Sequence, residues 1–116
     1  TSSAASDVYK RQSMNIKELK SNEIMPGFHG RILHGSDFTW VYWEIDKGSN
    51  LPEHNHVNEQ LMHVIKGKFE FTINGKKHLC EEGSTFQIPS NVPHSGKAIT
   101  SCEIMDVFSP KREDLG

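Results

Sequence analysis

Four residues in two separate segments have the types and spacing to hold a metal ion: His54, His56, Gln60 and His94. In an extended strand, residues two apart point to the same side, so His54 and His56 would direct two imidazoles toward one point. A neutral imidazole is a good ligand for first-row divalent ions. An isolated pair is a weak signal, because single histidines are common in surface loops. The joint spacing of all four residues favours a metal site.

Gln60 is the unusual member of this set, because an amide oxygen is a poorer ligand than a carboxylate. Glu59 is the alternative ligand, but strand alternation places it on the face opposite Gln60, so we favour Gln60. A neutral fourth ligand leaves more net positive charge on the ion and makes it a stronger Lewis acid. Three imidazoles and one amide leave coordination positions open, which is typical of a catalytic site.

The last apolar run carries a second signal, because Cys102, Ile104, Asp106 and Phe108 alternate onto one face of a strand. If that face is interior, the Asp106 carboxylate must be paired or used in chemistry. If the face is exposed, Asp106 is an ordinary surface charge. Taken alone, Arg112 is expected in a solvated tail. The charged residues around it are also expected to be solvated: Lys111, Glu113 and Asp114.

The elements that position these residues are predicted to be β-strands. Glycine and proline separate short runs rich in aromatic and β-branched residues, among them residues 38–45, 69–73, 77–80 and 102–108. Asn74 and Gly75 predict a two-residue type I′ turn. Residues 15–23 fit either a helical turn or an edge strand. The pattern predicts an all-β fold with one jelly-roll barrel.

Length and charge restrict the function further. A chain of 116 residues has room for one domain, which we expect over residues 14–116, whereas residues 1–13 have the composition of a disordered leader that is not native. A net charge of −2 without a basic stripe argues against nucleic acid and anionic membranes. Cys80 and Cys102 are expected to be reduced, partly buried thiols, which fits the cytoplasm. No apolar run is long enough to span a bilayer.

The two segments resemble the two motifs of the cupin superfamily. The first reads Gly48, His54, His56, Gln60 and Gly67 in the spacing G(X)5HXH(X)3–4E(X)6G, with Gln60 in place of the usual Glu. The second follows G(X)5PXG(X)2H and ends at His94. Its middle glycine is replaced by Asn91, a residue that still tolerates positive φ. The resemblance implies a cupin jelly roll.

A narrower resemblance connects residues 27–114 to the KdgF family of pectin and alginate breakdown. It rests on residues 54–60, on residues 88–95 and on a D-x-F-x-x-x-R pattern that falls on Asp106, Phe108 and Arg112. The likeness implies metal ligands at His54, His56, Gln60 and His94. It implies ring opening of a 4,5-unsaturated monouronate to 4-deoxy-5-hexosulose uronate, with Asp106 moving a proton, and Arg112 and Phe108 binding substrate.

Other functions remain open at this stage. A cupin dioxygenase or a lyase acting on another small acid is one alternative, and a non-catalytic cupin that binds sugar acids is another. The ligand set accepts one divalent ion without selecting among nickel, zinc, iron, cobalt and manganese. Small cupins of this kind are expected to form homodimers.

Overall fold

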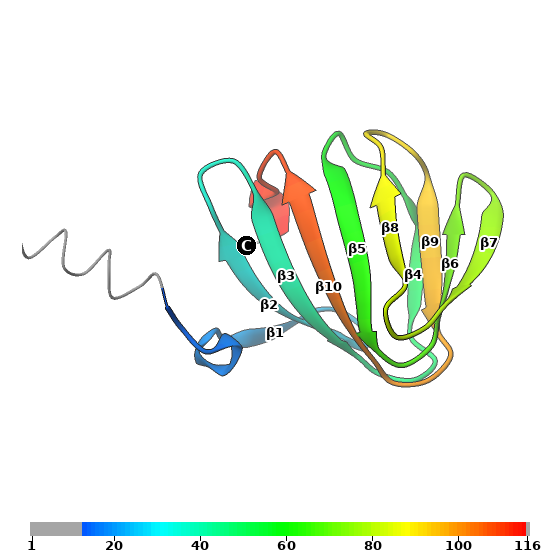
Figure 1. The fold of residues 1–116 in the computed structure, drawn as a ribbon, viewed down its shortest axis with the longest axis horizontal. Coiled ribbons are helices and arrows are strands. Elements are labelled where there is room, and N and C mark those ends of the chain that lie inside the picture. The colour runs from blue at the N-terminus through cyan, green and yellow to red at the C-terminus, as the bar shows by residue number, and fades with distance from the viewer. Residues whose placement is uncertain (1–12, 116) are drawn as a thin grey trace, which may run out of the picture.

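The strands form two antiparallel sheets in the computed structural model, which describes residues 13–115 (Figure 1). The elements are η1 (Ile16–Glu18), β1 (Ser21–Met25), β2 (Phe28–His34), β3 (Thr39–Ile45), β4 (Asn50–His54), β5 (Glu59–Lys66), β6 (Phe69–Ile73), β7 (Lys76–Cys80), β8 (Thr85–Ile88), β9 (His94–Ala98), β10 (Cys102–Ser109) and η2 (Glu113–Leu115). The six-stranded sheet has the order β1-β2-β3-β10-β5-β8, and the four-stranded sheet has the order β4-β9-β6-β7. The predicted all-β jelly roll is confirmed, and its strands form two separate sheets.

Residues 15–23, which fit either a helical turn or an edge strand, contain the turn first and the start of the strand after it. The 3-10 turn η1 is capped by Asn15, whose side chain accepts a hydrogen bond from the Lys17 amide. Strand β1 then forms the outer edge of the six-stranded sheet by pairing with β2. The predicted leader falls on residues that lie, except for Ser13, outside the described part of the chain.

The predicted strands agree with the observed ones to within a residue at each end. Strand β6 has the predicted bounds, β3 begins one residue later, β7 begins one residue earlier and β10 ends one residue later. Asn74 and Gly75 have φ values of 49° and 80°, so both adopt the left-handed conformation that a type I′ turn requires. The turn prediction is therefore confirmed.

Alternate residues of β3 and β10 are buried. On β10 the buried residues are Cys102, Ile104, Asp106 and Phe108, so the interior alternative for Asp106 is the one observed. Both cysteines are buried free thiols, as expected. The core consists of Phe28, Val41, Trp43, Ile45, Met62, Val64, Phe69, Phe71, Cys80, Ile88, Ala98, Cys102, Ile104 and Phe108.

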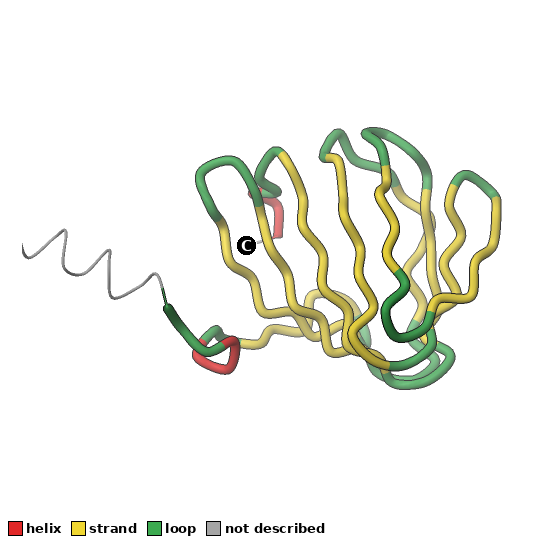
Figure 2. Tube along the Cα trace, viewed as in Figure 1, coloured by secondary structure: helices red, strands yellow, loops and turns green. Residues whose placement is uncertain are grey.

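Loops gather at the two ends of the strands (Figure 2). Because neighbouring strands are antiparallel, one end collects the β4–β5 loop, the β8–β9 loop and the segment after β10. All the residues singled out for chemistry lie at that end or just inside it. None of the helices within residues 13–115 is long and apolar enough to cross a membrane.

Candidate metal centre and adjoining cavity

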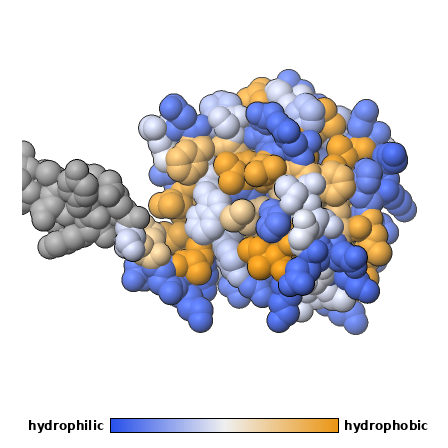
Figure 3. Space-filling view, in the orientation of Figure 1, coloured by the Kyte–Doolittle hydropathy of each residue, from blue (hydrophilic) through white to orange (hydrophobic). Residues whose placement is uncertain are grey.

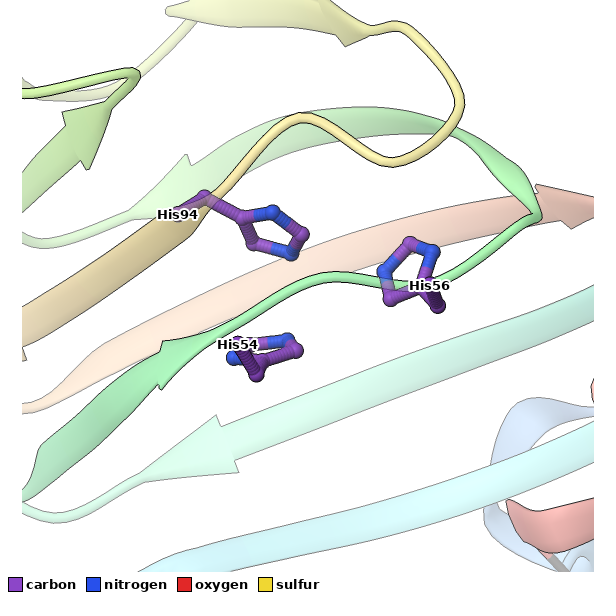
Figure 4. Close-up of side chains that lie close together, drawn as sticks. All are labelled: His54, His56 and His94. Atoms are coloured by element: carbon purple, nitrogen blue, oxygen red, sulfur yellow. The ribbon is translucent and has the colours of Figure 1, made fainter.

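Three histidines converge at this end of the molecule, with their rings turned toward one another (Figure 4). The ring centroids of His54 and His94 are 4.2 Å apart, and those of His56 and His94 are 5.0 Å apart. One ligand nitrogen from each ring lies within 4.8 Å of the other two. The predicted cluster of three imidazoles is thus present, and it could hold a metal ion.

The route by which His54 and His56 meet differs from the expected one. His54 is the last residue of β4, but His56 lies in the loop before β5, so strand alternation does not aim both rings. The backbone of that loop positions His56 instead. Its carbonyl oxygen accepts a hydrogen bond of 2.8 Å from the amide of Asn91. The loop that carries His56 is therefore tied to the loop that leads into His94.

Hydrogen bonds fix the tautomer of each imidazole. Every Nδ1 atom lies near a backbone carbonyl oxygen two residues away: His54 near Pro52 at 2.9 Å, His56 near Asn58 at 2.8 Å and His94 near Val92 at 2.9 Å. A carbonyl oxygen only accepts, so each Nδ1 must carry the proton. Each Nε2 atom then has a free lone pair, which is the form that binds a metal ion.

His94 shows most directly that the residues fit a metal ion. Its Nε2 atom is buried and has no hydrogen-bond partner within the described residues. Burial lowers the pKa of His94 to about 4, and burial also lowers the pKa of His56. Both rings are therefore neutral near pH 7. A buried lone pair without a partner is costly unless a cation uses it.

Gln60 lies beside the cluster with its oxygen toward it. Gln60 is buried at the start of β5, whereas Glu59 is exposed on the other face and accepts a hydrogen bond from Gln87. The Oε1 atom of Gln60 lies 3.1 Å from Nε2 of His56. With the proton of His56 on Nδ1, two acceptors face each other, an arrangement that a shared cation would stabilise. The predicted faces of Gln60 and Glu59 are confirmed.

Asp106 fixes the orientation of the Gln60 amide. Gln60 Nε2 donates a hydrogen bond of 2.9 Å to Oδ1 of Asp106, and the indole Nε1 of Trp43 donates one of 2.9 Å to Oδ2. Burial raises the pKa of Asp106 to about 6, although both hydrogen bonds oppose this shift. Asp106 therefore changes protonation close to neutral pH, as a group that carries a proton must do.

A cavity of about 300 Å³ adjoins the histidines. Its polar lining includes His54, Gln60, His94, Asp106 and Arg112. Phe108 forms part of the apolar wall, and the guanidinium carbon of Arg112 lies 4.9 Å from the centre of the Phe108 ring. Arg112 is thus at the cavity. The expectation from this residue alone, that it lies in a solvated tail, is wrong for its side chain.

Sequence reasoning missed two residues of this constellation. Trp43 lies in one of the predicted strands and is not among the residues singled out for chemistry, yet its indole donates a hydrogen bond to Asp106. Asp114 is exposed, as the sequence predicts for the charged residues around Arg112, and its carboxylate also pairs with Arg112 at 2.7 Å. No local pattern in β3 indicates a partner 63 positions away.

The two facing sheets and the histidine cluster at one end define a cupin. Residues 41–108 match the family model described as cupin domain, and the chain belongs to this family. Among cupins, it is similar to the pectin degradation protein KdgF of Dickeya dadantii, with 30% identity over 80% of this chain and 87% of the relative. The structure of KdgF from a Halomonas species superposes with a TM-score of 0.81 at 28% identity, covering 86% of this chain and 94% of that one. An RmlC-like cupin from Shewanella frigidimarina superposes with a TM-score of 0.84 at 27% identity, covering 90% and 94%.

Proposed function

We propose that this cupin is a metal-dependent enzyme that opens the ring of 4,5-unsaturated monouronates from pectin or alginate breakdown and releases 4-deoxy-5-hexosulose uronate. The observation that carries the proposal is the shared cavity, which places a buried carboxylate and an arginine beside the histidine cluster. The similarity to KdgF proteins, one of which is named for pectin degradation, supports the substrate class.

His54, His56, Gln60 and His94 would hold one divalent ion. Such an ion supplies a Lewis acid that polarises substrate oxygens and lowers the cost of developing negative charge. The four ligands carry no charge themselves, so the charge of the ion is not offset within this set. Nickel, zinc, iron, cobalt and manganese all accept imidazole and amide donors.

Asp106 is the group that moves the proton. Ring opening removes the proton of the anomeric hydroxyl, forms the C1 carbonyl and breaks the bond from C1 to the ring oxygen. The resulting enolate takes a proton at C4 and becomes the C5 ketone, so the reaction is an isomerisation with no net gain or loss of protons. Two acceptor sites of the carboxylate are used by Gln60 and Trp43, and others remain free for substrate.

Arg112 and Phe108 bind the sugar acid. A guanidinium matches the geometry of a carboxylate and can form two parallel hydrogen bonds with it. Phe108 is 2% exposed and offers an apolar wall for one face of the ring. This pairing of charge and wall selects a uronate over a neutral sugar.

The test follows the ultraviolet absorbance of the conjugated enol ether in an unsaturated monouronate after addition of metal-loaded protein. Spontaneous opening of the ring sets the baseline, and a double variant with His54→Ala and His56→Ala is the control. We expect faster decay that requires both histidines. Decay at the control rate by metal-loaded protein would exclude this reaction. Oxygen uptake by iron-loaded protein would then favour a dioxygenase, and tight binding without turnover would favour a sugar-acid binder.

A further inference from the structure

The segment after β10 is clamped onto the end of the sheet by two buried polar side chains. Asn58 Nδ2 donates a hydrogen bond of 2.6 Å to the carbonyl oxygen of Pro110, and Thr39 Oγ1 accepts one of 2.8 Å from the Arg112 amide. Thr39 is 0% exposed and Asn58 is 8% exposed. The backbone of Arg112 is thus fixed beside the cavity, and only its long side chain needs a further restraint.

Asp114 supplies that restraint. Nε of Arg112 donates to Oδ1 of Asp114 at 3.3 Å, and Nη2 donates to Oδ2 at 2.7 Å. The side chain of Arg112 is 15% exposed, whereas that of Asp114 is 66% exposed, so the carboxylate holds the guanidinium from its outer side. The Phe108 ring supports the flat face of the same guanidinium.

This pairing occupies only one edge of the guanidinium. A guanidinium has five N–H donors, and the bonds to Asp114 use the Nε edge. Nη1 has no hydrogen-bond partner within residues 13–115, although Arg112 lines the cavity. The remaining edge is therefore available to a second carboxylate while Asp114 stays in place.

We propose that Asp114 is a positioning residue that holds Arg112 by its Nε edge, so that the opposite edge receives the carboxylate of the substrate. The inference rests on the proposed function for the identity of that substrate. It predicts that Asp114 acts on the binding of the uronate and leaves the proton transfer at Asp106 unchanged, because Asp114 does not line the cavity.

The first test measures turnover of an unsaturated monouronate by the Asp114→Ala variant. We expect KM to rise by about tenfold with kcat within about twofold of the parent, since removal of a pure binding interaction raises KM alone. Asp114→Asn, which keeps one acceptor oxygen, should give an intermediate KM. Glu113→Ala is the matched control, because Glu113 is an exposed neighbour that forms no hydrogen bond with Arg112. An unchanged or lower KM in Asp114→Ala would overturn the proposal, the latter by showing that Asp114 competes with substrate.

The second test does not depend on turnover, so it separates failure of this proposal from failure of the proposed function. The sequence contains three arginines, so the Nε–H region of an NMR spectrum of zinc-loaded protein is sparse, and Arg112→Lys assigns the signal. D-Glucuronate, a saturated uronate that cannot react, serves as the probe. We expect a saturable shift of the Arg112 signal in the parent that needs about tenfold more probe in Asp114→Ala. The same titration in both proteins would contradict the inference, even if the monouronate were turned over.

Discussion

At the scale of residues, the candidate site is one chain of alternating donors and acceptors. Trp43 donates to Asp106, Asp106 accepts from Gln60, and the Gln60 oxygen is thereby left facing His56. An ionised carboxylate can only accept, so reversing the Gln60 amide would place two acceptors together. Asp106, the proposed proton carrier, thus also orients Gln60, the proposed fourth ligand. A change in the position of either side chain therefore changes the position of the other.

Trp43→Phe removes the donor at the end of this chain but keeps a ring against Phe28. Loss of a hydrogen bond to a buried charged group lowers the free energy of unfolding by about 1.5–3 kcal/mol. We also expect kcat on the monouronate to fall by about tenfold, since general acid–base catalysis depends on the position of the proton carrier. Urea titration and initial rates measure the two effects.

Trp40→Phe is the control for that variant. Trp40 lies on the same strand but on the outer face, where no hydrogen bond of its indole is recorded among the described residues. The same change in ring size occurs there without loss of the bond to Asp106. Equal losses of stability and rate in both variants would show that ring volume, and not the hydrogen bond, is what matters.

His94 makes the stability of the metal-free protein depend on pH. Its pKa is about 4 when folded against 6.5 as the ordinary value, so the unfolded chain takes up the proton first as the pH falls. Stability is then lost between pH 6.5 and 4, by about 3 kcal/mol at about 1.4 kcal/mol per pKa unit. Asp106 has the opposite effect on stability. Its folded pKa of about 6 exceeds the ordinary 3.8, so the folded chain takes up this proton first and gains stability as the pH falls.

A difference measurement separates these two groups. Urea unfolding of chelator-treated parent and His94→Gln is compared at pH 7 and at pH 4. The Asp106 contribution is common to both proteins, so the parent should lose about 3 kcal/mol more than the variant over this interval. A difference that does not change with pH would mean that the His94 imidazole is not held neutral in the folded chain.

At the scale of elements, the sequence predicts what short-range patterns encode. Alternation and the Asn74-Gly75 turn are local, so the strands, the shared face of alternate β10 residues and the opposite faces of Gln60 and Glu59 could be predicted. The contact between Trp43 and Asp106 depends on the register of β3 against β10, which no single segment encodes. The place of Arg112 at the cavity depends on how the last segment folds back to Thr39 of β3, which accepts a hydrogen bond from the Arg112 amide.

The β8–β9 loop gives a prediction at this scale. Asn91 has φ of 65°, as its place in the second motif suggested, and its amide bonds to the His56 carbonyl. Asn91→Val should lower the free energy of unfolding by about 1–3 kcal/mol, because a β-branched residue is strained at positive φ. The strain should also weaken metal binding, which isothermal titration with zinc measures.

Asn91→Gly is the matched control, since glycine adopts positive φ without strain. Stability and zinc affinity close to those of the parent are expected for it. If Val and Gly at this position behaved alike, the backbone conformation of the loop would not be what holds His56 and His94 together.

At the scale of the whole molecule, an apolar stripe crosses the outer face of the six-stranded sheet. The strand registers place Leu33 beside Trp40, Trp40 beside Val107, and Val107 beside Leu61. Hydrophobic residues accordingly gather over β3, β10 and β5 in the space-filling view (Figure 3). Leu61 is 42% exposed on this face.

We propose that a second copy of the chain covers this stripe and forms the expected homodimer. Two sheets pack face to face when their apolar sides meet, and a two-fold axis brings the same stripe from each copy into contact. A row that is apolar along its length is complementary to itself, which an isologous interface requires. A glutamate in the stripe would place two like charges in the buried centre of that contact.

Leu61→Glu is therefore expected to convert the dimer to monomers, with a rise of at least about 100-fold in the dissociation constant, because an unpaired buried charge is strongly disfavoured. Sedimentation velocity across a range of protein concentrations measures this. Leu79→Glu is the control: Leu79 is 64% exposed on β7 of the other sheet, and the same change there should leave the dimer intact. A parent that sediments as a monomer, or a dimer that dissociates only with Leu79→Glu, would show that the stripe is not the interface.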